Sequence, residues 1–171
     1  MTGIFRIAAC LWLLASSSAA SAQETAIGPP AKRGGDAGLQ FLDPAGLPAP
    51  AGYSHAVQAP PGRTIYVSGQ LPLDKDGKLI GADDFAAQAG QVFANLRTAL
   101  AAAGATFDDV VKLNMFVTDM KQLPALRAAR DRYINLRKPP ASTLVEVNRF
   151  VRDGVMVEID ATAVVGDDRR K

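Results

Sequence analysis

The fold class is decided by one stretch near the end of the chain, Val155-Met156-Val157-Glu158-Ile159-Asp160-Ala161-Thr162-Ala163-Val164-Val165. Side chains of a β-strand point alternately to its two faces. The odd-numbered positions here are all apolar, whereas Glu158, Asp160 and Thr162 share the other face. The pattern predicts a strand with one face on the core and one face that carries polar groups.

Two segments upstream predict a helix and a further strand. Asp83 and Asp84 place carboxylates where they can cap the first N–H groups of a helix. The apolar positions that follow have helical spacing and end near residue 103. These positions are Phe85, Ala89, Val92, Leu96, Ala99 and Ala103. Gly104 suits the left-handed position after a helix, and residues 110–118 alternate as a strand does.

The remaining segments complete the predicted order of elements. Residues 53–57 and 64–68 are rich in β-branched and aromatic residues on either side of a Pro-Pro-Gly-Arg turn, which predicts a hairpin. A second helix is expected over residues 122–136, with Arg127 and Arg130 facing solvent, and a strand over residues 143–147. The order β-β-α-β-α-β-β predicts an α+β fold, a mixed sheet with two helices packed on one face.

The chain divides into three predicted regions. Residues 1–22 carry a basic start, a short apolar run and an Ala20-Ser21-Ala22 cleavage site, which together predict a secretory signal peptide. Residues 23–50 are rich in Pro, Gly and Ala and are expected to form a flexible arm. Residues 51–171 form the predicted folded domain. The mature protein is therefore expected to be exported, to the periplasm or beyond, and to have no membrane segment after cleavage.

Composition excludes several classes of protein. The chain has 171 residues, of which 48% are hydrophobic and 21% charged, and its formal net charge is +2. These values are typical of one globular domain and exclude a coiled coil, a collagen and a disordered chain. The basic residues are scattered, so a nucleic-acid partner is not expected.

The sequence offers little to hold a cofactor. His55 is the single histidine and Cys10 the single cysteine, so the usual zinc ligand sets cannot be assembled. The glycine-rich motifs that cradle dinucleotides or nucleoside triphosphates are also absent. We expect no metal and no organic cofactor, and we interpret His55 as an ordinary surface residue.

Two carboxylates are the first candidates for chemistry. Glu158 and Asp160 project from the same strand face. One interpretation is structural, with both groups accepting hydrogen bonds at a solvated sheet. The other is that the site raises the pKa of one carboxyl group, so that it can move a proton or orient a water molecule.

Several segments resemble, in order and spacing, the Rid family of RidA/YjgF-like reactive intermediate deaminases, also described as L-PSP endoribonucleases. The resemblance extends over residues 53–165. It is carried most clearly by Val67-Ser68-Gly69-Gln70-Leu71-Pro72, Pro139-Pro140-Ala141-Ser142-Thr143 and Val157-Glu158-Ile159-Asp160-Ala161.

The resemblance implies a chorismate-mutase-like subunit that assembles as a homotrimer, with small-molecule clefts between subunits. It also implies hydrolysis of enamines or imines to a keto acid and ammonia without a cofactor. Glu158 would be catalytic, and Tyr53, Ser68, Ser142 and Thr143 would bind the substrate.

One position departs from the family pattern. The deaminases carry an arginine where this chain has Ser142, and a hydroxyl group cannot form the bidentate pair that a guanidinium makes with a carboxylate. Amino-acid-derived substrates are therefore expected to bind poorly. Arg137, Lys138 or Arg149 could supply a replacement cation, on the ground of sequence proximity alone.

Three functions stay open at this point. The first is a deaminase whose substrate recognition does not depend on a carboxylate clamp. The second is a non-catalytic trimeric protein that binds a small ligand in the periplasm. The third, an endoribonuclease, requires cytosolic RNA, and both the signal peptide and the near-neutral charge argue against it.

Overall fold

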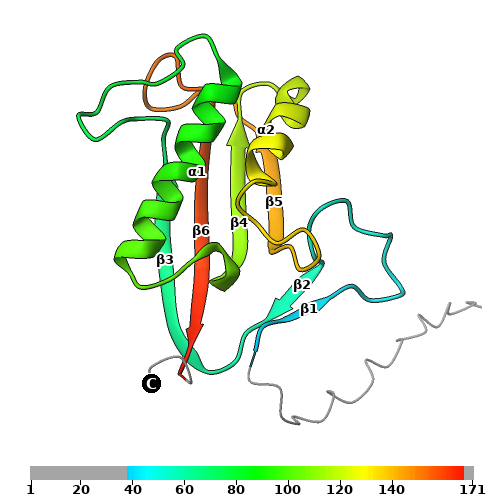
Figure 1. Ribbon diagram of the computed structural model, residues 1–171. Coiled ribbons are helices and arrows are strands. Elements are labelled where there is room, and N and C mark those ends of the chain that lie inside the picture. Colours follow the sequence, from blue (N-terminus) through cyan, green and yellow to red (C-terminus); the bar gives the residue numbers. More distant parts are fainter. Residues whose placement is uncertain (1–37, 168–171) are drawn as a thin grey trace, which may run out of the picture. The chain divides into compact units, whose positions relative to one another are not determined.

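The computed structural model describes residues 38–167. The predicted signal peptide and the first part of the predicted arm lie outside the described residues. Within them, four strands form the main sheet in the spatial order β3-β6-β4-β5 (Figure 1). The strands are β3 (Gly62–Gln70), β4 (Val110–Val117), β5 (Ala141–Glu146) and β6 (Val157–Gly166).

The sheet is mixed, as predicted. β6 pairs antiparallel with β3 on one side and with β4 on the other, whereas β4 and β5 run parallel. The parallel pair requires a crossover connection, which the second helix provides. β6, the strand whose pattern decided the fold class, therefore lies inside the sheet with a partner along each edge.

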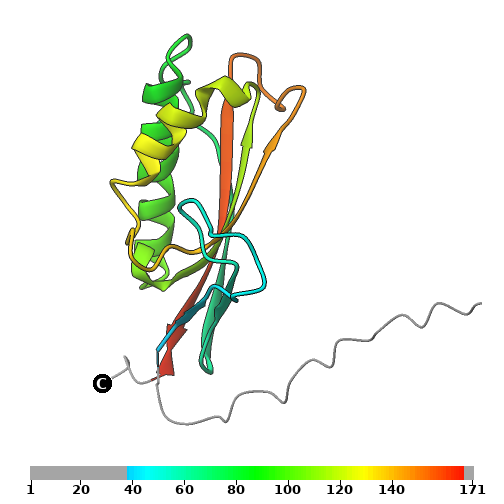
Figure 2. The ribbon, with the colours of Figure 1, turned by 90° about the vertical axis from the view of Figure 1, so that its right-hand side faces the viewer.

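Two helices, α1 (Phe85–Ala102) and α2 (Leu123–Arg130), cover one face of this sheet (Figure 2). The Asp84 carboxylate accepts the N–H of Ala87 at 3.0 Å, which confirms the predicted cap. Gly104 has a φ of 69°, the left-handed conformation predicted after the helix. Short 3₁₀ turns at Phe107–Asp109 and Met120–Gln122 precede β4 and α2.

The core lies between the helices and the sheet. Phe93 and Leu96 of α1 and Leu113 of β4 are fully buried there. Burial of each such side chain contributes about 1.5–3 kcal/mol of hydrophobic free energy. Val157 and Ile159 of β6 face the same core, whereas the alternate residues of β6 do not, which confirms the predicted two-faced strand.

The predicted hairpin of residues 53–57 and 64–68 is wrong. β2 (Ala56–Gln58) pairs instead with β1 (Gln40–Leu42), and β3 pairs along its length with β6. The two prolines at positions 60 and 61 lack N–H groups and separate β2 from β3, while β6 offers β3 a longer partner. Because β1 lies within residues 23–50, part of the predicted arm is a strand.

The predicted second helix is too long at its C-terminal end. α2 ends at Arg130, and the chain then turns so that Tyr133 stacks on Phe93 with ring centroids 5.4 Å apart. Ile134 is buried in the turn, and Leu136 is exposed, so the apolar spacing beyond Arg130 belongs to a turn and not to a helix face.

Candidate functional site

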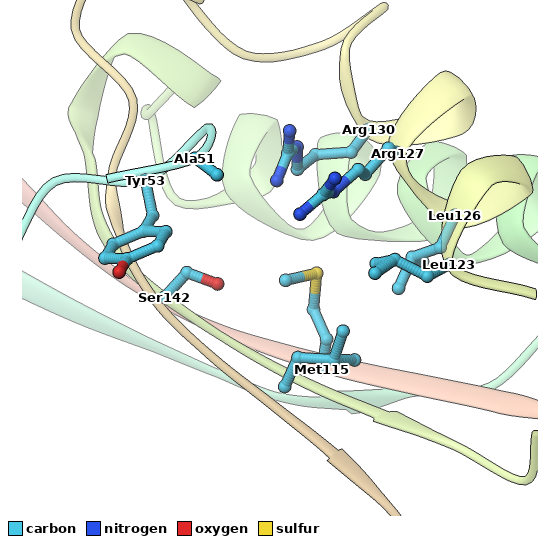
Figure 3. A pocket seen from close by; sticks show the side chains of 9 residues that line it. Ala51, Tyr53, Met115, Leu123, Leu126, Arg127, Arg130 and Ser142 are labelled. Atoms are coloured by element: carbon cyan, nitrogen blue, oxygen red, sulfur yellow. The ribbon is translucent and has the colours of Figure 1, made fainter. Parts of the chain in front are cut away.

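A cavity of about 170 Å³ opens between α2, the start of β5 and the segment that precedes β2 (Figure 3). We call it the helix-face cavity. It is lined by Ala51, Tyr53, Met115, Leu123, Leu126, Arg127, Arg130, Ser142 and Leu144. Its volume is below the roughly 300–1,000 Å³ of a typical drug-sized pocket, so it suits a small molecule or one end of a larger one.

The position of Ser142 in the cavity follows from strand register. β5 pairs with β4 so that Ser142 lies beside Leu113 and Leu144 beside Met115. Laterally paired residues point to the same face of a sheet, and Leu113 is fully buried beneath the helices. Ser142 and Leu144 therefore point to the face that α2 covers.

Tyr53 is held beside Ser142 by the residue that follows it. The Ser54 hydroxyl donates to the Pro139 carbonyl at 2.8 Å, and the Ser54 N–H donates to the Pro140 carbonyl at 3.2 Å. Ser54 is only 2% exposed, so these bonds are protected from water. They fix residues 51–53 along the start of β5 and make one wall of the cavity.

Two arginines from α2 line the cavity. Arg130 is 7% exposed, and both its Nε and Nη2 atoms contact Oδ1 of Asp131, at 2.9 and 2.8 Å. Arg127 is exposed, and its guanidinium makes no hydrogen bond or ion pair with any described residue. The predicted solvent position of Arg130 is therefore wrong, because its guanidinium packs against the loop at Gly52.

The arginines could have been found from spacing. Leu123, Leu126, Arg127 and Arg130 follow the i, i+3, i+4, i+7 pattern of one helix face. Sequence proximity favoured instead Arg137, Lys138 and Arg149, none of which lines this cavity. Proximity to Ser142 in the sequence did not identify the cavity arginines, because these reach the cavity from one face of α2.

Glu158 lies in a second group of polar residues, which we call the open-face group: Ser68, Gly69 and Glu158. A β-bulge between Val67 and Gln70 brings Gly69 so close to Glu158 that a Cβ atom at position 69 would overlap the Glu158 carboxylate. Partial burial, and then the nearby Asp160 carboxylate, raise the pKa of Glu158 above its ordinary value. The carboxyl group is thus moved toward the range that suits proton transfer near neutral pH.

Other polar residues on the Glu158 face of the sheet are hydrogen-bonded to one another. Asn114 donates its side-chain amide to the Asp160 carboxylate at 2.9 Å, which supports the structural interpretation for Asp160. Thr143 contacts Lys112 through a 2.6 Å hydrogen bond from the ammonium group to the hydroxyl. Thr143 alternates with Ser142 along β5, so it points away from the helix-face cavity.

The predicted site residues fall into two groups on opposite sides of one sheet. Ser142 pairs with Leu113, whereas Glu158 pairs with Phe116, which is three residues further along β4 and faces the other way. Within one protomer, Tyr53 therefore lies beside Ser142. Glu158 lies beside Gly69, which follows Ser68 in the sequence. One protomer does not bring these two groups together.

His55 and the other candidate ligands take ordinary structural positions. The His55 ring nitrogen contacts the Pro48 carbonyl at 2.8 Å, and its backbone N–H donates to Asp43 at 2.9 Å. Between residues 38 and 167, no three His, Cys, Asp or Glu side chains are grouped so that they could hold a metal ion. In the same part of the chain no helix is long and apolar enough to cross a membrane.

Sequence comparison finds relatives along most of the chain. The family model described as Endoribonuclease L-PSP matches residues 45–165. Protein DfrA of Myxococcus xanthus is 40% identical over 112 residues, which are 66% of this chain and 84% of DfrA. A RutC family protein of Synechocystis is 36% identical over 129 residues, covering 74% of this chain and 97% of that protein.

Solved structures agree with these matches. A Yersinia pestis protein of unknown function from the conserved Rid family, YyfB, is similar with a TM-score of 0.66 at 32% identity, covering 74% of this chain and 98% of YyfB. RidA from an Antarctic Psychrobacter is similar with a TM-score of 0.56 at 34% identity, covering 74% and 99% of the two chains.

Proposed function

Because this chain belongs to the Rid family, we propose that it is a cofactor-independent hydrolase that deaminates a small enamine or imine. The observation that carries the proposal is Glu158. It is a partly buried carboxyl group whose pKa is raised, and it has a glycine instead of a side chain beside it. The glycine leaves room for the carboxylate to lie against the bulge of β3.

The chemistry assigned to Glu158 is general base catalysis followed by proton return. The Glu158 carboxylate takes a proton from water as the water oxygen bonds to the imine carbon. The proton passes to the nitrogen of the resulting carbinolamine. The carboxylate then moves the hydroxyl proton of the carbinolamine to the same nitrogen as the C–N bond breaks, so that ammonia leaves and a carbonyl group remains. An enamine first gains a proton at carbon and becomes the imine.

We further propose that the protein acts as a homotrimer, with each reaction site between two subunits. The support is that the helix-face cavity and the open-face group lie on opposite faces of one sheet. In a cyclic assembly one surface of each subunit meets a different surface of the next. Tyr53 and Ser142 of one subunit would then complete a cleft with Ser68 and Glu158 of its neighbour.

The proposal is tested by the release of ammonia and keto acid from freshly generated enamines and imines. We expect turnover by the purified protein and a loss of at least about 100-fold in Glu158→Gln, since general base catalysis contributes about 10²–10⁴-fold. Asp76→Asn is the control, because Asp76 is an exposed carboxylate that pairs with Lys75 and lies in neither the cavity nor the open-face group. Unchanged turnover in Glu158→Gln would remove Glu158 from the mechanism.

One observation favours a second function, non-catalytic binding of a small ligand. The helix-face cavity is complete within one protomer and does not include Glu158. A protein that only binds its ligand could use this cavity alone. Absence of turnover on every imine tested, in a correctly assembled protein that still binds a small molecule, would favour this alternative.

We also propose that the protein is exported to the periplasm, on the basis of residues 1–22 of the sequence. Mass spectrometry of protein from fractionated cells is expected to find a mature chain that begins at Gln23 outside the cytoplasm. A full-length chain confined to the cytoplasm would contradict export.

A further inference from the structure

A second cavity, of about 340 Å³, lies between the C-terminal half of α1, the 3₁₀ turn Phe107–Asp109 and the turn that follows α2. We call it the helix-end groove. Its volume falls within the roughly 300–1,000 Å³ of small-molecule pockets. None of its lining residues lines the helix-face cavity or belongs to the open-face group, so it is separate from both parts of the proposed reaction site.

Arg97 of α1 is held over an aromatic ring of the groove. Its Cζ atom lies 5.6 Å from the centroid of the Tyr133 ring, and that ring stacks on the buried Phe93. The N–H groups of a guanidinium lie in its own plane, so a guanidinium held over a ring can still donate them to a ligand. None of these groups donates to a described residue. Arg97 is therefore positioned by Tyr133 and keeps its hydrogen-bonding capacity for a ligand.

Arg132 brings a second guanidinium to the same groove from the turn after α2. Its side chain lies against α1, where a Cβ atom built at Gly90 would be 3.6 Å from Nη2 of Arg132. The adjacent Asp131 contacts Arg130 instead, and the Arg132 guanidinium has no hydrogen bond or ion pair with any described residue. Two uncompensated guanidinium groups match a phosphate monoester, which carries a charge of about −1.5 to −2 at pH 7.

Asp108 adds a carboxylate from a third element, the 3₁₀ turn before β4. It is exposed, and its side chain pairs neither with the two arginines nor with any other described residue. A ligand that carries both a phosphate and an ammonium group would complement all three charged side chains, because an ammonium group donates to a carboxylate. The small side chains of Ala101 and Ala105 leave room for a short carbon chain between the two ends of the ligand.

We infer that the helix-end groove binds a small phosphate monoester that carries an ammonium group. Arg97 and Arg132 hold the phosphate, and Asp108 holds the ammonium group. The groove shares no residue with the site proposed for imine hydrolysis, so this inference does not depend on the proposed function.

The test is calorimetric titration of the purified protein with phosphoethanolamine, and with its two halves, inorganic phosphate and ethanolamine. We expect phosphoethanolamine to bind at least about tenfold more tightly than either half, because it alone pairs with both arginines and with Asp108. Absence of binding by phosphoethanolamine, or equal binding of phosphoethanolamine and inorganic phosphate, would overturn the inference.

Variants of the three charged residues separate the two ends of the ligand. Arg97→Gln and Arg132→Gln should each weaken the binding of phosphoethanolamine and of phosphate at least about tenfold. Asp108→Asn should weaken the binding of phosphoethanolamine alone. Arg137→Gln is the matched control, because it removes the same charge from an exposed residue outside the groove. Equal weakening by Arg137→Gln and the two groove variants would mean a general charge effect and would overturn the inference.

A second arm distinguishes a free ligand from a lipid headgroup. Phosphatidylethanolamine carries the same two groups, but its phosphate is a diester with a single negative charge. We therefore expect no co-sedimentation of the protein with vesicles made of equal parts of phosphatidylethanolamine and phosphatidylcholine. Co-sedimentation that is lost in Arg97→Gln, in a protein that binds no free phosphoethanolamine, would overturn the inference of a small-molecule ligand.

Discussion

The helix-face cavity and the open-face group lie on opposite faces of one sheet, and a single protomer completes only the first. The cavity is lined by α2, β4, β5 and the loop of residues 51–53, and the buried Ser54 fixes that loop by hydrogen bonds. The open-face group lies on the strands of the sheet, and within residues 38–167 no helix covers that face. The difference supports the proposal that one subunit forms the cavity by its own folding, whereas Glu158 acts only after a second subunit covers its face of the sheet.

Both regions use a glycine to bring a charged side chain close to the backbone. A Cβ atom at Gly52 would lie 2.7 Å from Nη2 of Arg130, and one at Gly69 would overlap Glu158. The two glycines differ in conformation, because Gly52 has a φ of 82° and Gly69 does not have a positive φ. The same substitution should therefore have different effects on the two faces.

Gly69→Ala is expected to give the largest change, a loss of about 100-fold in imine hydrolysis, because displacement of a reacting group by about 1 Å can cost that much. Stability should change by less than about 0.5 kcal/mol, since the flexible end of the Glu158 side chain can move aside. Activity and urea unfolding measured on the same preparation check both parts.

Gly46→Ala is the control for this prediction. Gly46 is exposed, and nothing lies within 4 Å of a Cβ atom built there. Full activity in Gly69→Ala would mean that the position of Glu158 is not critical.

Gly52→Ala is expected to act mainly on stability. A non-glycine residue at positive φ costs about 1–3 kcal/mol, and the new methyl group also presses on the buried Arg130. Urea unfolding should show a lower free energy of unfolding. A variant as stable as the unmodified protein would show that the Gly52 loop is not held against α2.

The smallest effect is on the pH dependence of stability. A carboxyl group whose folded pKa is raised stabilises the fold below its ordinary pKa, and this contribution is lost as pH rises through the raised pKa. Urea midpoints at about pH 4 and pH 7 should therefore show that Glu158→Gln gains stability relative to the unmodified protein at the higher pH. An identical pH dependence of the two proteins would contradict a raised pKa.

Much of the fold could be predicted because local patterns agree with the tertiary structure. The alternation in β6 and β4 and the cap at Asp84 all specify elements that the core then buries. The hairpin prediction was wrong because β3 pairs with β6, which is far away in sequence, and not with the adjacent residues 53–57. The predicted C-terminal end of the second helix was wrong because the stacking of Tyr133 on Phe93 is a long-range contact.

The candidate site was harder to predict for the same reason. The family resemblance implied Tyr53, Ser142 and Glu158 as site residues. Their assignment to two faces required the register that pairs β5 and β6 with β4. Arg127 and Arg130 were missed as cavity residues because residue 142 was compared only with its neighbours in sequence. The residues opposite it across the cavity come from α2.

The most direct test of the central claim, that the two faces form one site across subunits, is a subunit-mixing experiment. Glu158→Gln disables the open-face group, and Ser142→Trp fills the helix-face cavity, so each variant alone should be inactive. Unfolding the two together and refolding them at equal amounts should restore about a quarter of the normal activity, the fraction of sites with one intact face from each neighbour in a randomly mixed ring. No recovery in correctly assembled mixtures would contradict a site shared between subunits.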